Sequence, residues 1–270
     1  MKYTHITPSF GVELAAGTQL AALTDGEVTA LKQLAAEHGI VVVRDQEMDK
    51  QGQAKFGHRL GTLMNSPVNR PDTPEELIVI RAGPKSKAVA GQGWHSDVSS
   101  EAVPPGLSML RMEVVPPSGG DTLFADMYQA FETLSPFMQT FLKQLHARHE
   151  PRGHYLYLSG AKKLEELPSS VHPVVRTHPL TRRNALYVNA GFVENIVELS
   201  QRESQALLAM LYDHVAYSVS IQCRVHWAPN TVVFWDNRIV QHHAAFDYHP
   251  AVRLGFRVTV VGEAPYLADE

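Results

Sequence analysis

The chain has 270 residues, of which 44% are apolar, so it can bury a sizeable core. Its net charge of -4 gives no support for a nucleic-acid or anionic-membrane partner, whose usual signature is a basic patch. The single cysteine, Cys223, excludes an internal disulfide and any paired-cysteine metal site. A bound metal would therefore need histidine and carboxylate ligands, and the chain contains 14 histidines.

The first half of the chain combines one clearly capped helix with short strands. Thr24 and Glu27 form a capping box, which predicts a helix over residues 25–37 that ends before Gly39. The apolar segment that follows is typical of a buried strand. Strands are predicted in this half over residues 40–44, 77–80, 107–115 and 121–125.

The second half contains two more helices and a strand-rich end. Ser135 followed by Pro136 is typical of a helix start and predicts a helix to about residue 145. Ser200 and Glu203 form a second capping box, followed by leucines at helical spacing. Strands are predicted over residues 174–177, 185–188, 220–227, 231–235 and 254–261.

The order of these elements indicates the fold class. Strands and helices do not alternate regularly, which argues against a doubly wound sheet or a (β/α)8 barrel. We predict an α+β protein built on an antiparallel sandwich or jelly roll. No segment is typical of a linker, so residues 1–270 are predicted to form a single domain. No signal peptide or membrane-spanning apolar run is apparent, and we expect a cytoplasmic protein.

A candidate metal site lies at residues 94–97, where His95 and Asp97 are separated by one residue. In an extended strand both side chains point to the same face and can bind one cation. A third ligand must come from elsewhere, and His242 or His243 are candidates. Two histidines and one carboxylate form the facial triad of non-haem Fe(II) oxygenases. By itself the short motif is common by chance.

The C-terminal strand alternates strictly. Arg253, Gly255, Arg257 and Thr259 share one face, and four apolar residues share the other. In a half-exposed strand the arginine face would contact solvent. Alternatively, the arginines face a closed interior and bind anions there, because a buried guanidinium requires an anionic partner. In that case Gly255 would leave room for a ligand between them.

The order of the motifs resembles the taurine dioxygenase / 2,4-dichlorophenoxyacetate dioxygenase family, and the likeness covers nearly the whole chain. The matching segments are residues 94–97, 118–122, 235–238, 241–242 and 253–257. The resemblance implies a double-stranded β-helix (jelly-roll) core flanked by helices. It also implies a dioxygenase that uses Fe(II), 2-oxoglutarate and O2, releases succinate and CO2, and hydroxylates its substrate.

The resemblance also implies roles for individual residues. The iron ligands would be His95, Asp97 and His242, which is preferred over His243 because it occupies the family's position. Asp97 favours hydroxylation, since related halogenases replace this carboxylate with a small residue. No catalytic residue beyond the metal site is required.

Two further pairings follow from the same resemblance. Thr122 and Arg253 would bind the distal carboxylate of 2-oxoglutarate, and Arg257 would pair with an anionic group of the substrate.

The rest of the implied substrate pocket departs from taurine dioxygenase. Ser66, Asn69 and Gly91 stand where that enzyme has a histidine, a tyrosine and an asparagine, whereas Tyr155 and Phe192 match it. These changes speak against taurine itself. They leave another sulfonate, a sulfate ester, a phenoxyalkanoate or an amino-acid-like carboxylate as the small anionic substrate.

Two other classes of protein fit part of the pattern. A jelly-roll zinc-dependent hydrolase would use the same three ligands but would have no use for Thr122 with Arg253. A non-catalytic metal-binding or scaffold protein would not depend on His95. By analogy with the family, a homo-oligomer is also expected.

Overall fold

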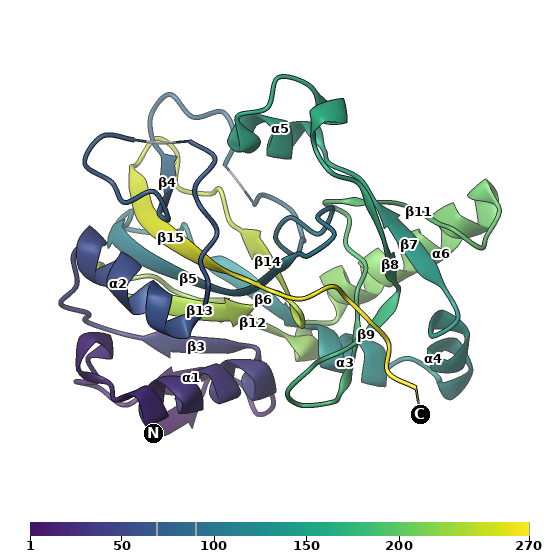
Figure 1. The fold of residues 1–270 in the computed structure, drawn as a ribbon, viewed down its shortest axis with the longest axis horizontal. Coiled ribbons are helices and arrows are strands. Elements are labelled where there is room, and N and C mark those ends of the chain that lie inside the picture. Colours follow the sequence, from purple (N-terminus) through teal and green to yellow (C-terminus); the bar gives the residue numbers. More distant parts are fainter. Residues whose placement is uncertain (69, 90, 270) are drawn as a thin grey trace.

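The computed structural model describes residues 1–68, 70–89 and 91–269. Its largest element is a seven-stranded sheet of order β1-β2-β3-β13-β5-β15-β4, in which only the β2–β3 pair is parallel (Figure 1). The strands of this sheet are β1 (Tyr3–His5), β2 (Val12–Leu14), β3 (Ile40–Val43), β13 (Val232–Asp236), β5 (Pro105–Val114), β15 (Arg253–Val261) and β4 (Ile78–Ala82).

A smaller antiparallel sheet packs against the inner face of the large one. Its strands are β12 (Gln222–Val225), β6 (Thr122–Asp126) and β14 (Val240–Ala244). Phe124 and Val240 from this sheet share a hydrophobic cluster with Val42, Leu110 and Trp235 from the large sheet. The fold is therefore the α+β jelly-roll arrangement that the sequence predicted.

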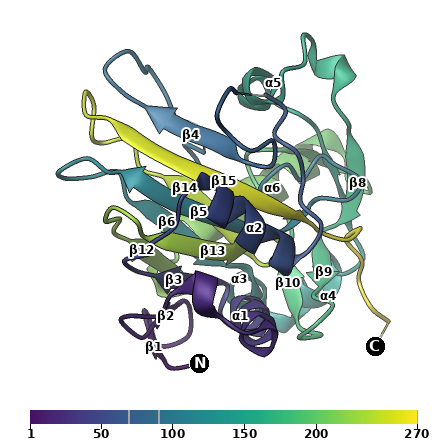
Figure 2. The same cartoon turned by 60° about the vertical axis from the view of Figure 1, so that its left-hand side comes forward.

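The central strands of the large sheet are buried on both faces. In β3, Ile40 and Val42 belong to the cluster between the sheets, whereas Val41 and Val43 belong to a second cluster on the outer face. Helices α1 (Asp25–His38) and α2 (Lys50–Leu60) cover that outer face (Figure 2). Double burial explains why this strand is a continuous apolar run.

The remaining helices and strands lie on the opposite side of the molecule from α2 (Figure 1). Strands β11 (Val193–Ile196), β7 (His146–His149) and β8 (Ser170–Pro173) form one sheet, and β9 (Val175–Thr177) pairs with β10 (Asn184–Leu186). The helices here are α3 (Met127–Glu132), α4 (Pro136–Leu142), α5 (Gly153–Ser159) and α6 (Gln201–Tyr217). Among the described residues, none of the helices is long and apolar enough to cross a membrane.

The capping signals in the sequence are confirmed. Both predicted capping boxes are present, with Thr24 opening α1 and Ser200 opening α6. Two predictions were too long by several residues. Helix α4 ends at Leu142, and the strand expected over residues 220–227 begins at Gln222, after a 3-10 turn at Val219–Ile221.

Candidate active site

Three side chains converge between the two sheets. His95 and Asp97 lie in the segment before β5, and His242 lies in β14. Backbone hydrogen bonds of 3.2 and 2.9 Å join His95 to His242. The Nε2 atoms of the two histidines lie 3.9 and 4.0 Å from Asp97 Oδ1, and one ligand atom of each residue lies within 4.8 Å of the others. This nitrogen and oxygen donor set fits one ferrous ion as a facial triad.

The hydrogen bonding and electrostatics of the three side chains also favour metal binding. His95 Nδ1 donates to the Gly93 carbonyl at 2.9 Å, because a carbonyl only accepts, and this leaves Nε2 as the free ligand atom. Burial and the adjacent His95 hold the pKa of His242 well below its usual value. Burial would raise the pKa of Asp97, but Arg257 and both histidines together lower it to about 2. Neutral imidazoles and an ionised carboxylate are the forms that bind metals.

The two candidate histidines of β14 have different surroundings. His242 belongs to the converging group, and its ring lies 4.1 Å from that of His95. His243 instead packs its ring edge-on against Trp94, at 5.8 Å. Neighbouring residues of a strand point to opposite faces, so only one of the two can reach the site.

Arg253 and Thr122 lie side by side, as the resemblance implied. Arg253 is 5% exposed, its Nε donates to the Gly120 carbonyl at 3.1 Å, and its Nη2 lies 3.5 Å from Thr122 Oγ1. None of the ion pairs among the described residues includes Arg253. A buried guanidinium without a carboxylate partner is a site for an anionic ligand.

Arg257 has a different partner. Its Nη1 donates to Asp97 Oδ1 at 2.7 Å, so the second arginine contacts a carboxylate of the triad directly. Its Nε is buried without a hydrogen-bond partner. Both arginines of β15 face the interior, which decides against the solvent-exposed alternative.

One cavity of about 200 Å³ brings the predicted groups together. It is lined by all six residues predicted to bind iron, 2-oxoglutarate and the substrate anion, namely His95, Asp97, Thr122, His242, Arg253 and Arg257. Gly91, Tyr155 and Phe192 also line it, and the rings of the latter two lie 5.8 Å apart. Burial raises the pKa of Tyr155 to about 12, so its hydroxyl is protonated at neutral pH.

One predicted pocket residue, Ser66, does not line the cavity. Ser66 is flanked by Asn65 and Pro67, which do line the cavity, but its own hydroxyl donates to the Val68 carbonyl at 3.1 Å. Asn69 lies outside the described residues.

The expectation that Gly255 leaves room for a ligand is wrong. A Cβ at this position would lie 2.6 Å from Met112 Sδ and 2.8 Å from the Arg111 carbonyl oxygen. The space beside Gly255 is therefore filled by strand β5, and the glycine permits close packing within the sheet.

Sequence reasoning did not assign several residues of the site. Thr259 lines the cavity, and its hydroxyl is buried without a partner. The alternation of β15 had placed it on the arginine face, so a signal was available. Asn65 and the apolar wall formed by Met64, Ile78 and Leu110 come from separate segments and had no motif to mark them.

Comparison with known proteins places the chain in a family. A profile of the family described as taurine catabolism dioxygenase TauD, TfdA family matches residues 2–259. An alpha-ketoglutarate-dependent sulfonate dioxygenase of Saccharomyces cerevisiae is 37% identical, over 100% of this chain and 70% of the relative. An alpha-ketoglutarate-dependent sulfate ester dioxygenase of Pseudomonas putida is 33% identical, over 90% of this chain and 83% of its own.

A solved structure shows the same fold. A taurine dioxygenase from Burkholderia xenovorans superimposes with a TM-score of 0.86 at 29% identity, over 99% of this chain and 93% of that one. This likeness covers nearly the whole chain, as do the family profile and the sequence relatives. The chain belongs to the taurine catabolism dioxygenase TauD, TfdA family.

Proposed function

We propose that this chain is an Fe(II)- and 2-oxoglutarate-dependent dioxygenase that hydroxylates a small anionic organic substrate. The observation that carries the proposal is the shared cavity. The His95, Asp97 and His242 triad faces the same space as a buried arginine that has no carboxylate partner, Arg253. A zinc hydrolase that used the same three ligands would have no function for the buried guanidinium of Arg253.

Each group has a distinct task in the proposed reaction. His95 and His242 offer imidazole nitrogens, and Asp97 offers a carboxylate oxygen, to hold the iron. Bound iron supplies the site at which O2 and 2-oxoglutarate react to give succinate and CO2. Arg253 and Thr122 bind the distal carboxylate of 2-oxoglutarate, which directs the keto acid end of the co-substrate toward the triad.

Arg257 and the cavity wall position the substrate. The guanidinium of Arg257 pairs with the anionic group, and its buried, unpartnered Nε adds a donor. Gly91, Tyr155 and Phe192 line the remaining space, and their apolar surroundings exclude water from the reacting centre.

We infer that the substrate is a sulfonate or sulfate ester with an apolar body, because Arg257 and many apolar side chains line the cavity. The sequence relatives named for sulfonates and sulfate esters support this head group. Asp97 supplies the only carboxylate among the described residues that line the cavity, and the metal and Arg257 engage it. The ammonium group of taurine therefore has no free carboxylate to pair with.

A substrate panel coupled to succinate formation tests the proposal. Fe(II)-loaded protein is supplied with 2-oxoglutarate and with taurine, propanesulfonate, hexyl sulfate, a phenoxyalkanoate or an amino acid. We expect succinate above the uncoupled background with at least one amine-free sulfonate or sulfate ester. No succinate with any anion, together with no binding of 2-oxoglutarate, would refute the dioxygenase function.

Three broader expectations stay predictions. We propose that residues 1–270 act as one domain, that the protein works in the cytoplasm, and that it forms a homo-oligomer.

A further inference from the structure

The two oxygens of the Asp97 carboxylate have different partners. Oδ1 accepts from Arg257 at 2.7 Å and is the oxygen that lies 3.9 and 4.0 Å from the histidine Nε2 atoms. Oδ2 accepts from the hydroxyl of Ser108 in β5, at 3.3 Å. Ser108 is fully buried, so water does not compete for this contact. One oxygen therefore faces the imidazoles while the other is held by the protein.

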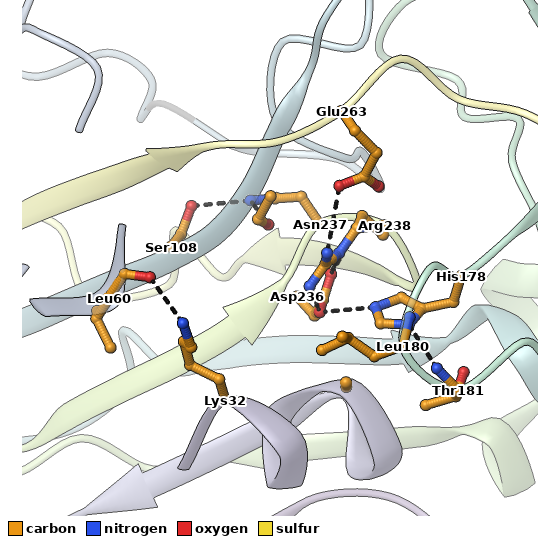
Figure 3. A network of polar contacts seen from close by, with 12 residues as sticks. Lys32, Leu60, Ser108, His178, Leu180, Thr181, Asp236, Asn237, Arg238 and Glu263 are labelled. Carbon is orange, nitrogen blue, oxygen red and sulfur yellow. Dashed lines mark hydrogen bonds and ion pairs between the residues drawn. The ribbon is translucent and has the colours of Figure 1, made fainter. Parts of the chain in front are cut away.

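The direction of this hydrogen bond is set by Asn237, as Figure 3 shows for the contact with Ser108. Asn237 Oδ1 accepts from the Trp235 indole at 2.9 Å and from the Asp97 backbone at 3.4 Å, and both of these groups can only donate. The amide nitrogen must then face Ser108, to which it donates at 2.9 Å. Because the Ser108 oxygen is engaged as an acceptor, its own proton is free for Asp97 Oδ2.

Ion pairs flank Asn237 in its turn. Asp236 accepts from Arg238 Nε at 2.7 Å and lies 3.2 Å from His178 Nε2 (Figure 3). Arg238 also reaches Glu263 at 3.4 Å. These contacts tie the residues on both sides of Asn237 to distant segments of the chain.

We propose that Ser108, oriented by Asn237, is a positioning residue that restricts Asp97 to binding the metal through Oδ1 alone. This inference rests on the proposed function. In an octahedral site, three protein atoms leave three open positions, which the keto acid and O2 require. If Asp97 bound through both oxygens, one of those positions would be lost. The donor chain from Trp235 through Asn237 and Ser108 prevents this by occupying Oδ2.

The test compares Ser108→Ala with Ser204→Ala. Ser204, in α6, is a matched control because it is also a buried serine, 1% exposed, but its hydroxyl accepts from the Ile196 backbone N–H at 2.8 Å and it does not line the cavity. Each protein is loaded with Mn(II). Water-proton relaxation then reports the exchangeable water bound to the metal, and titration with 2-oxoglutarate reports its affinity.

For Ser108→Ala we expect retained Mn(II) binding, about one third less metal-bound water, and 2-oxoglutarate affinity reduced roughly 10- to 100-fold. Ser204→Ala should match the wild type in all three measurements. Asn237→Leu, which keeps the number and branching of the side-chain heavy atoms but removes the donor to the Ser108 hydroxyl, should give a smaller loss in the same direction. This second variant also provides the test if Ser108→Ala does not fold.

Two results would overturn the inference: Ser108→Ala behaving like Ser204→Ala, or Ser108→Ala losing Mn(II) altogether. Failure of the proposed function looks different, because the wild type itself would then bind no 2-oxoglutarate, even if it binds Mn(II).

Discussion

Arg253 and Arg257 lie four residues apart on one face of β15, yet their surroundings differ. Arg253 is buried beside Thr122 and the Gly120 carbonyl, and none of the ion pairs among the described residues includes it. Arg257 instead contacts Asp97 at 2.7 Å, next to the candidate metal ligands. Under the proposed function, this spacing along the strand would separate the co-substrate site from the substrate site.

The first prediction concerns Arg253→Ala. Removing a buried, charge-assisted contact costs roughly 1.5–3 kcal/mol, so the KM for 2-oxoglutarate should rise roughly 10- to 150-fold. The KM for the anionic substrate should change much less. Steady-state kinetics with both ligands varied measure this. Arg148→Ala, which removes a half-exposed arginine of β7, serves as the control. An equal rise in both KM values would contradict the division between the two arginines.

At the residue scale, sequence reasoning works where a motif has a fixed spacing. His95 with Asp97, His242, and the arginines of β15 were predicted because order and spacing mark them. Ser108 was not, since a lone serine in an apolar strand has no pattern. Its significance depends on a hydrogen bond with Asn237, which is 129 positions away in the chain.

At the scale of elements, β15 serves both the core and the site. Its apolar residues pack in the outer cluster beneath α2, while its arginines face the cavity. Gly255 allows β5 to approach closely between the two arginines. The strand thus holds both arginines in place through its packing with β5.

The second prediction follows from that packing. A Cβ in Gly255→Ala would lie 2.8 Å from the Arg111 carbonyl oxygen, which is backbone and cannot move aside easily. We expect the free energy of unfolding to fall by about 1–3 kcal/mol in urea denaturation. Gly26→Ala is the matched control, because nothing lies within 4 Å of its Cβ position at the start of α1. Equal stability of the two variants would show that β5 does not constrain β15.

Some elements could not be predicted because tertiary contacts override their local pattern. Helix α2 buries Gln53, Ala54 and Gly57, so it lacks a strong apolar stripe. Its buried amide is stabilised by a 2.6 Å hydrogen bond to the Phe256 carbonyl, which periodicity does not reveal. Strand β14 is likewise polar but buried, because Gln241 bonds the Val188 carbonyl and His242 faces the site.

At the scale of the whole molecule, burial accounts for part of the excess of histidines. His149, His172 and His178 are buried outside the triad. His149 is fully buried and its Nδ1 lies 2.9 Å from the Ser99 hydroxyl. Burial, together with His172, lowers the pKa of His149 to about 3, so the ring is neutral in the folded protein.

The third prediction concerns acid stability. Below about pH 6.5 the unfolded chain protonates His149 but the folded chain does not, so stability falls as the pH drops from about 6.5 toward 3. The contribution of one such group approaches about 1.4 kcal/mol per pH unit. In His149→Gln, which cannot titrate, the free energy of unfolding should depend less steeply on pH in this window. Urea denaturation at several pH values measures the slope.

The control for that experiment is His146→Gln. His146 is half-exposed on the same strand and pairs with Glu198, so it lacks the complete burial of His149. If the free energy of unfolding of His149→Gln depended on pH as steeply as that of the wild type, the buried ring would not contribute to the loss of stability in acid.

The proposed dioxygenase function depends on one reaction occurring in the cavity between the two sheets. The most direct measurement is the yield of succinate and of oxidised substrate from Fe(II)-loaded protein given O2, 2-oxoglutarate and the best anion of the panel. We predict one succinate for each substrate oxidised, and loss of both products in His95→Ala. Conversion of the substrate without consumption of 2-oxoglutarate, sustained by zinc in place of iron, would contradict it.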